Sequence, residues 1–290
     1  MNMSFAIGTT AIIVFTVYWS YRGFKDSRFT NEYIFSPIYI QKDKQYHRLI
    51  SSGFLHANWI HLIFNMLSLY FFGVDIELVA GLGEFLLIYL GSIVGGNLLS
   101  LYLHRHHDYR ALGASGGVCG IIFASIFLFP GGSMFVFPLP IPIPSWLYAI
   151  LFIIVSFFGM RNQWGRIGHD AHLGGAIVGL LITTILRPSI VLRSPVLYLT
   201  VMGISAGLFY YLYKDPRHVP IGLLFSRAYW QSMWLDAQAR KRARRERLDD
   251  ETLNRLLDKI SRSGMESLTA SEKRQLEAIS KRMRESRRIY

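Results

Sequence analysis

Long hydrophobic runs with few charges dominate the first three quarters of the chain. A helix that crosses a bilayer needs about 20 mainly apolar residues, and seven runs come close to that length. We expect membrane spans at 5–21, 57–75, 83–103, 114–130, 145–160, 170–187 and 195–213. The pattern therefore predicts an all-α fold, a polytopic transmembrane helix bundle.

The connections between these runs differ in character. Residues 22–56 carry six Lys or Arg residues among several aromatic ones, a mixture that favours the headgroup level of a membrane. Residues 130–144 contain Pro-Gly-Gly and then four prolines at alternate positions, which exclude a helix. We expect the first connection to lie at the membrane surface and the second to form a stiff turn.

After Tyr213 the chain becomes polar and basic. Residues 1–213 hold 12 Lys or Arg and 8 Asp or Glu, a net charge of +4. Residues 214–290 hold 19 and 11, a net charge of +8. We therefore divide the chain into a transmembrane domain at 1–213 and a basic helical C-terminal tail at 214–290.

The first part of this tail suits a membrane surface. Aromatic, aliphatic and basic residues at 216–236 predict an amphipathic segment at the interface, and a basic block follows at 240–245. The arginines are interleaved with acidic residues and no nucleic-acid binding motif is present. We expect contact with anionic lipids or with a protein, and no binding of nucleic acid.

The second part of the tail predicts two short helices. Leucine and isoleucine residues recur at helical spacing within 249–263, and a second helical stretch runs over 270–287. Thr269 and Glu272 fit a capping box at the start of the second helix.

Ser115 stands at the start of the fourth predicted span, in the sequence Gly-Ala-Ser-Gly-Gly from Gly113. Polar residues in membrane spans are costly and tend to be functional. Small neighbours let other backbone approach the hydroxyl, and the free N–H groups of a helix start can stabilise an oxyanion. The same residues also suit close helix packing, so the motif alone leaves both interpretations open.

One stripe of the sixth span is formed by His172, Gly175, Ala176 and Gly179. Small residues let two membrane helices pack closely, which would bring Ser115 and His172 within hydrogen-bond distance. A neutral imidazole can then take the proton of the serine hydroxyl. The pattern predicts a serine–histidine dyad.

His61 and Asn65 lie four residues apart in the second span and share one helix face. Both side chains can donate a hydrogen bond. Taken alone, the pair is better explained by a structural hydrogen bond between helices.

Taken together, these motifs resemble the rhomboid family of intramembrane serine proteases. The matching pieces are His47-Arg48 with His56, His61 with Asn65, Gly113-Ala114-Ser115-Gly116, and Ala171-His172-Leu173-Gly174-Gly175 with Gly179. They occur in the family's order, on the second, fourth and sixth spans. The resemblance covers about residues 5–190.

The resemblance implies a six-helix core, to which the last apolar run adds a seventh helix. Ser115 would be the nucleophile, and His172 the general base and then the acid. His61, Asn65 and the Ser115 N–H group would stabilise the oxyanion, and Gly113 would support that pocket. The substrates would be membrane-anchored proteins whose helices unwind readily near one end, and no cofactor is implied.

Two positions limit this resemblance. Cys119 is the single cysteine, which excludes an intramolecular disulfide, and it stands where relatives usually carry an aromatic ring one turn after the serine. Asp170 lies two residues before His172, on another face of the helix. We therefore predict a dyad and no acidic third member.

Two alternatives compete with the protease. A metal enzyme could use His56, His169 and His172, but the H-E-x-x-H pattern is absent, so we expect no metal. The loop histidines are interpreted as solvated surface residues: His104, His106 and His107. The other alternative is a catalytically inactive rhomboid-like factor that binds and remodels membrane proteins. Such relatives lose the serine or the histidine, and this chain keeps both.

The charges also bear on orientation. The rhomboid arrangement places the site on the side opposite the N-terminus, and a seventh span would place the basic tail on that same side. The excess of Lys and Arg would put this side in the cytosol, whereas most relatives cut at the outer face. We expect a multi-pass protein of the bacterial inner (cell) membrane, and its orientation stays open.

Overall fold

The computed structural model describes residues 6–106, 108–135, 141–162, 168–214, 234, 238 and 248–286. The chain divides into two compact units, Met1–Pro220 and Ile221–Tyr290, and each is described by itself. The predicted amphipathic segment at 216–236 lies outside the described residues except for Trp234, and the basic block at 240–245 lies outside them entirely.

Each of the seven predicted spans is a helix. Their bounds are α1 Ile7–Lys25, α5 Trp59–Ala80, α6 Leu82–His104, α7 Ser115–Leu128, α8 Ser145–Asn162, α9 His169–Leu186 and α11 Pro195–Lys214. Within the described residues, α5, α6, α8, α9 and α11 are long and apolar enough to cross a membrane, and α7 is a shorter apolar helix; α1 is not among the candidate spans. The prediction of a polytopic helical bundle is confirmed.

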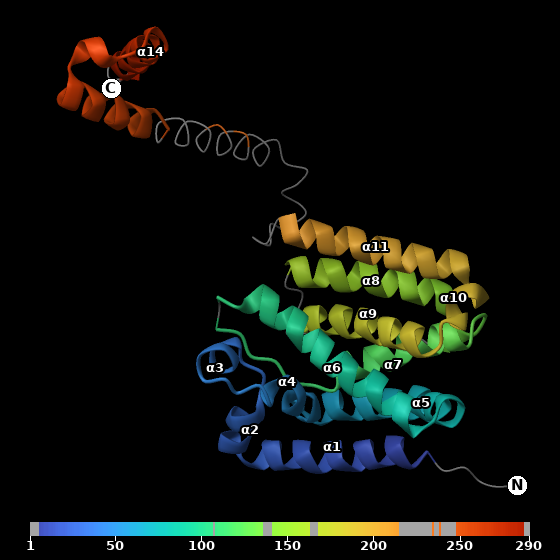
Figure 1. The fold of residues 1–290 in the computed structure, drawn as a ribbon. Helices are drawn as coiled ribbons and strands as arrows, with labels where there is room; N and C mark the ends of the chain where they lie inside the picture. Colours follow the sequence, from blue (N-terminus) through green and yellow to red (C-terminus); the bar gives the residue numbers. More distant parts are fainter. Residues whose placement is uncertain are drawn as a thin grey trace, which may run out of the picture. The chain divides into compact units, whose positions relative to one another are not determined.

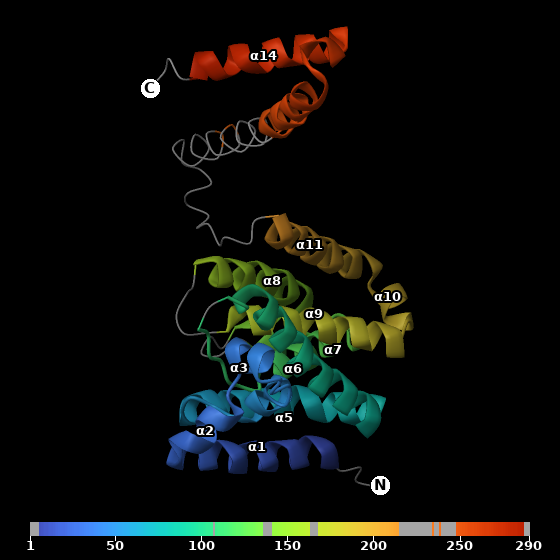
Figure 2. The same cartoon turned by 60° about the vertical axis from the view of Figure 1, so that its left-hand side comes forward.

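The helices of the first unit follow one another in layers (Figure 1). Helix α1 packs on α5, while α6, α7 and α9 pack against one another at the centre. Helix α8 packs on α9, and α11 packs on the outer side of α8, as the rotated view also shows (Figure 2). Helix α7 is almost wholly buried between its neighbours.

Glycines let the central helices approach to backbone contact. A Cβ atom on Gly175 would overlap the carbonyl of Gly116, and one on Gly96 would overlap the carbonyl of Ala171. The prediction that glycine faces bring α7 and α9 together is therefore confirmed. Helix α7 has 14 residues, so at roughly 1.5 Å per residue it is about 21 Å long, shorter than a hydrocarbon core of about 30 Å.

Short elements fill the two main connections. The predicted surface connection contains α2 Ser27–Tyr33, α3 Pro37–Lys42, α4 Arg48–Ser51 and the 3₁₀ turn η1 Ser52–Phe54. Its buried Arg48 donates through Nη1 to the carbonyls of Asn31 and Ile34, at 2.8 and 2.7 Å. This side chain therefore ties α4 to the end of α2.

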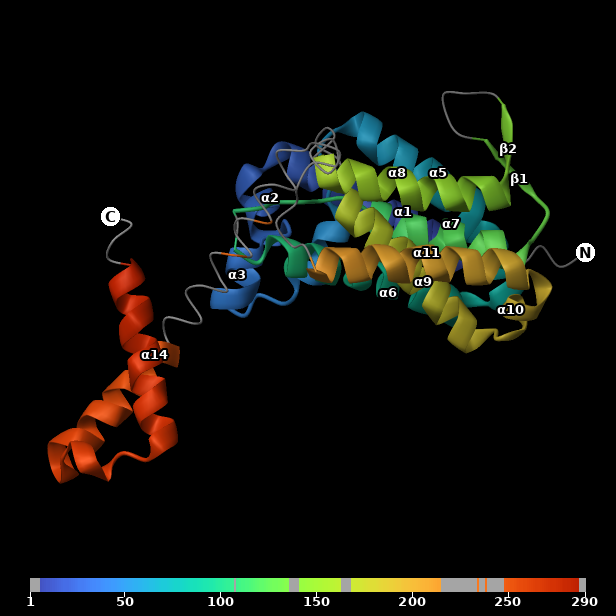
Figure 3. The same cartoon turned by 90° about the horizontal axis from the view of Figure 1, so that it is seen from above.

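The proline-rich connection forms a small antiparallel pair, β1 Ser133–Phe135 with β2 Pro142–Pro144. Seen from above, this pair and α10 (Ser189–Arg193) lie at the end of the bundle opposite α2 and α3 (Figure 3). Helix α7 leads into β1, and α9 leads into α10. Both helices therefore begin at the end where α2 and α3 lie.

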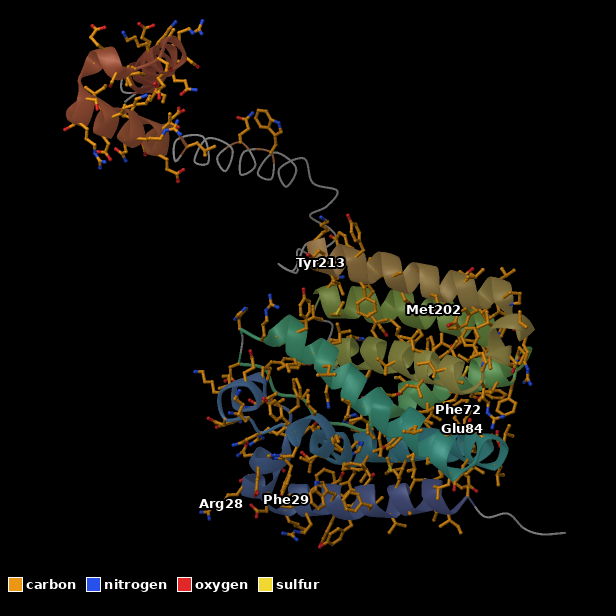
Figure 4. All side chains as sticks on the ribbon, viewed as in Figure 1. Arg28, Phe29, Phe72, Glu84, Met202 and Tyr213 are labelled. Carbon is orange, nitrogen blue, oxygen red and sulfur yellow. The ribbon has the colours of Figure 1, made fainter. Side chains whose placement is uncertain are left out.

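Two carboxylates fasten helices of the first unit to one another. The Glu77 carboxylate on α5 accepts from the N–H groups of Gly8 and Thr9, at 2.8 and 2.7 Å, and so holds the start of α1. Glu84, near the start of α6 (Figure 4), accepts from Arg187 Nε at 2.7 Å just beyond the end of α9. These pairs join helices whose apolar surfaces alone specify no register.

The second unit contains a helix over 248–263, η2 Met265–Ser267 and α14 Ala270–Ser286. The Thr269 N–H donates to Glu272 at 2.8 Å, and the Glu272 N–H donates back to the Thr269 hydroxyl at 3.3 Å. Lys259 Nζ also donates to Glu272, at 2.8 Å. The two predicted helices and the predicted capping box are confirmed.

Candidate active site

Ser115 is the first residue of α7, and Ala114 precedes it at the N-cap position. The first bond of the helix ladder runs from Val118 N–H to Ala114 O at 3.0 Å. The N–H groups that precede Val118 in the helix therefore have no acceptor within the helix. The Ser115 hydroxyl lies beside donors that could stabilise a negative charge.

His172 lies in the first turn of α9, and its Nε2 atom is 2.6 Å from Ser115 Oγ. The neutral ring accepts from the hydroxyl through Nε2 when its proton is on Nδ1. The contact follows from the close approach of Gly175 to Gly116, which brings the starts of α7 and α9 together.

His61 lies in the first turn of α5, close to Gly113 in the loop that leads into Ser115. Gly113 has a φ angle of +140°, and a Cβ atom there would lie 2.8 Å from His61 Cε1 and 3.5 Å from Ser115 Oγ. Gly113 is thus required both for its backbone conformation and for the space between the imidazole and the hydroxyl.

Asn65 lies one turn beyond His61 and is 7% exposed. Its Nδ2 donates to the carbonyl of His61 at 2.8 Å. An amide nitrogen carries two N–H groups, so this bond uses one of them. The structure places His61 beside Gly113 and Ser115, and it places Asn65 one turn further along the helix, supporting His61.

His56 connects this loop to α1. Its Nε2 accepts from Ala114 N–H at 3.3 Å, its Nδ1 lies 2.9 Å from Ser20 Oγ, and Ser20 donates to the carbonyl of Phe54 at 2.8 Å. Burial, and then the nearby His61, lower the pKa of His56 to about 3. A neutral His56 ring with its proton on Nδ1 is consistent with all three hydrogen bonds: Nδ1 donates to Ser20 Oγ, Ser20 donates to Phe54 O, and Nε2 accepts from Ala114 N–H.

Asp170 is buried beside Tyr109 and His104. His104 is therefore not the solvated residue that the sequence predicts: its ring stacks on Tyr109, with centroids 3.7 Å apart. His106 is exposed and accepts from Arg105, while His107 lies outside the described residues. The spacing of residues in the sequence gives no sign of the contact that His104 makes with Tyr109 and Asp170.

The surroundings of His172 also differ from those that the family resemblance implies. Cys119 is buried in α7, and the His169 ring lies 6.1 Å from the His172 ring, at 70° to it. His169 lies against Gly159 of α8. In the part of the chain that the structure describes, no three His, Cys, Asp or Glu side chains are grouped to hold a metal ion.

The geometry can be set beside known proteins. A family model described as a rhomboid domain matches residues 43–189, just over half of the chain. A model described as a family of unknown function (DUF6576) matches residues 239–282.

Several relatives match the same region. Rhomboid protein 1, mitochondrial, from Saccharomyces cerevisiae is 31% identical over 137 residues, which cover 46% of this chain and 40% of that protein. RHOMBOID-like protein 12, mitochondrial, from Arabidopsis thaliana is 33% identical over 159 residues, with 48% and 46% covered. Rhomboid protease GluP from Bacillus subtilis is 26% identical over 181 residues, with 61% and 34% covered. The chain spans less than half the length of each of these three.

Proposed function

The chain belongs to the rhomboid family, and we propose on that premise that it is an intramembrane serine endopeptidase. It cleaves membrane-anchored proteins in or beside their transmembrane segments. The observation that carries the proposal is the 2.6 Å contact between His172 Nε2 and Ser115 Oγ. A serine hydroxyl is a weak nucleophile until such a base takes its proton.

The proposed reaction has two halves. In the first, His172 takes the Ser115 proton while the oxygen attacks the scissile carbonyl carbon, and the imidazolium then protonates the leaving amine. In the second, His172 takes a proton from water and the resulting hydroxide attacks the acyl carbon on Ser115. The bond to Ser115 Oγ then breaks, the imidazolium returns its proton to that oxygen, and the acid product leaves. The dyad ends as it began, and one water molecule is consumed.

The oxyanion of each half needs donors that are already in place. The Ser115 N–H group at the start of α7 and the His61 ring beside Gly113 are the first candidates. Asn65 is the third, because one of its two N–H groups remains after its bond to His61 O. The first of these three groups belongs to α7, and the other two belong to α5.

The substrate class follows from the surroundings. Helices α5, α7 and α9 are apolar along their length, so a substrate segment that reaches Ser115 must itself tolerate a membrane. An intact helix keeps its carbonyls bonded within the helix, so the scissile segment must unwind first. Membrane proteins with helices that unwind readily near one end are therefore the proposed substrates and partners.

The test is cleavage of a single-span model substrate by the purified chain in detergent. We expect Ser115→Ala and His172→Ala each to abolish cleavage while the protein stays folded. Ser125→Ala, a serine ten residues further along α7, is the matched control and should cleave normally. Normal cleavage by Ser115→Ala would rule out the dyad. A folded wild-type chain that binds the substrate without cutting it would favour the inactive alternative.

The protein is a multi-pass integral membrane protein, and we propose the bacterial inner membrane as its location. Relatives named as mitochondrial and relatives from Bacillus subtilis both match it, so membrane fractionation of the native host decides this point. Reporter fusions after residues 190 and 290 test α11: opposite sides indicate a seventh span, and the same side excludes it.

A further inference from the structure

Asp170 carries a buried negative charge for which the proposed reaction has no direct use. It lies in the first turn of α9, two residues before His172, and is 3% exposed. A carboxylate at such a position is costly unless it is paired and hydrogen-bonded. Oδ1 accepts from the Tyr109 hydroxyl at 3.2 Å, and Oδ2 lies 3.2 Å from His104 Nε2.

The two partners of Asp170 form a rigid pair. The rings of His104 and Tyr109 lie parallel within 7°, with centroids 3.7 Å apart. Burial, and then the neighbouring Asp170 carboxylate, raise the pKa of Tyr109, so its hydroxyl stays protonated and remains a donor. His104 comes from the end of α6.

Tyr109 belongs to the loop that leads into Ser115. The same loop is held at Ala111, which exchanges two backbone hydrogen bonds with Phe35, at 3.0 and 3.3 Å. The Phe35 ring meets the edge of Tyr109, with centroids 6.1 Å apart. Phe35 and Asp170 therefore both hold the loop that leads into Ser115. Asp170 contacts it at Tyr109, which is six residues before the serine.

We propose that Asp170, held by Tyr109 and His104, is a positioning residue that sets the distance between Ser115 and His172. The inference rests on the proposed function. Asp170 lies in the first turn of α9, two residues before His172, and binds Tyr109 in the loop that leads into Ser115. It therefore connects the segments that carry the two dyad residues without contacting the reacting atoms. Small displacements of reacting groups cost rate steeply, which makes such a coupling useful.

Two conservative variants test the coupling in the full-length protein. Tyr109→Phe removes only the hydroxyl, and Asp170→Asn keeps the shape and removes the charge. We expect each to lower kcat for the model substrate about tenfold or more, with KM within about twofold. The double variant should be no more than about twofold slower than Asp170→Asn alone, because the Tyr109 hydroxyl acts through Asp170.

The matched control is Asp108→Asn. Asp108 lies in the same loop, is exposed, and is 3.9 Å from Arg110. We expect wild-type kcat from this variant. The rate at which a fluorophosphonate labels Ser115 is a second readout, and it should fall by a factor similar to kcat in Tyr109→Phe and Asp170→Asn. Thermal unfolding measured alongside separates misplacement from loss of folded protein.

The outcomes distinguish the two proposals. An active wild type with kcat within twofold in both variants overturns the positioning role and leaves the protease intact. A fall in kcat that matches the fall in folded fraction, at unchanged labelling rate per folded molecule, also overturns it. A wild type that neither cleaves nor reacts with the fluorophosphonate overturns the proposed function, and the positioning role with it.

Discussion

The contact between α7 and α9 and the contact between α8 and α11 show two different ways of joining helices. At the centre, backbone meets backbone: a Cβ on Gly175 would overlap Gly116, and one on Gly179 would overlap Gly120. On α11, Gly203 and Gly207 face open space among the described residues. The central geometry depends on the absence of side chains, whereas the outer contact depends on particular side chains.

Polar side chains contribute to holding α11, beside its buried apolar residues Val201 and Leu212. Arg161 of α8 is 1% exposed and donates from Nη2 to the Tyr211 hydroxyl at 2.9 Å, with its guanidinium 4.7 Å from the centre of that ring. Tyr198 lies 3.0 Å from the hydroxyl of Thr184 on α9. Much of the rest of α11 is exposed. The comparison teaches that the proposed active site should be sensitive to bulk at the centre and tolerant of change at α11.

The largest effect is expected from Gly175→Leu. The new side chain would meet the Gly116 carbonyl, and overpacking a tight contact costs about 1–3 kcal/mol or more. We expect cleavage to fall at least about 100-fold, because the dyad is displaced. Gly207→Leu on α11 is the matched control and should leave rate and melting temperature unchanged. Equal activity of the two variants would contradict the comparison.

A smaller effect on rate is expected from Asn65→Ala. This change leaves the central backbone contact intact and removes one of several proposed oxyanion donors, so cleavage should fall about 10²-fold or less. The melting temperature should change much less than in Gly175→Leu. A rate loss as complete as that of Ser115→Ala would mean that Asn65 has a further role.

At α11 the expected effect is on stability and not on rate. Tyr211→Phe removes the acceptor of a buried guanidinium N–H, which should cost about 1–3 kcal/mol. Thermal unfolding in detergent measures this, and cleavage by the folded protein should stay within about twofold of wild type. Tyr210→Phe, an exposed neighbour on the same helix, is the control. An inactive but stable Tyr211→Phe variant would show that α11 belongs to the site.

The smallest effect is expected in the second unit. Lys259, and then the Thr269 N–H and hydroxyl, lower the pKa of Glu272 from 4.5 to about 2. A lowered pKa of the Glu272 carboxyl stabilises the folded unit at pH values above the unfolded pKa of 4.5, and this contribution is lost as the pH falls from there through about 2. Glu272→Gln should therefore speed amide exchange in 270–286 at neutral pH. Wild-type exchange in the variant would show that the pair contributes nothing.

The sequence was enough to locate the helices, because a membrane span is defined by a long apolar run. The predicted 83–103 and 195–213 lie within two residues of α6 and α11. The glycine stripes also carried a spatial prediction, since small residues have few other uses at the helical spacing of Gly175 and Gly179. This is why the proximity of Ser115 and His172 could be expected from the sequence.

The supporting contacts could not be predicted in the same way. Asp170 and Tyr109 are 61 residues apart, and a hydrogen bond between two distant polar side chains leaves no periodic pattern. Single positions such as His56 and His104 likewise give no sign of whether water or a buried partner surrounds them. The short helices of 22–56 depend on Arg48 binding backbone carbonyls, which is again a long-range contact.

The central claim is that Ser115 is a nucleophile activated by His172. The most direct measurement is the intact mass of the purified chain after incubation with a fluorophosphonate, followed by peptide mapping. We expect one adduct, on Ser115, which is absent in Ser115→Ala and forms far more slowly in His172→Ala. An unmodified Ser115 in folded wild-type protein, or equally fast labelling of Ser115 in His172→Ala, would contradict the claim.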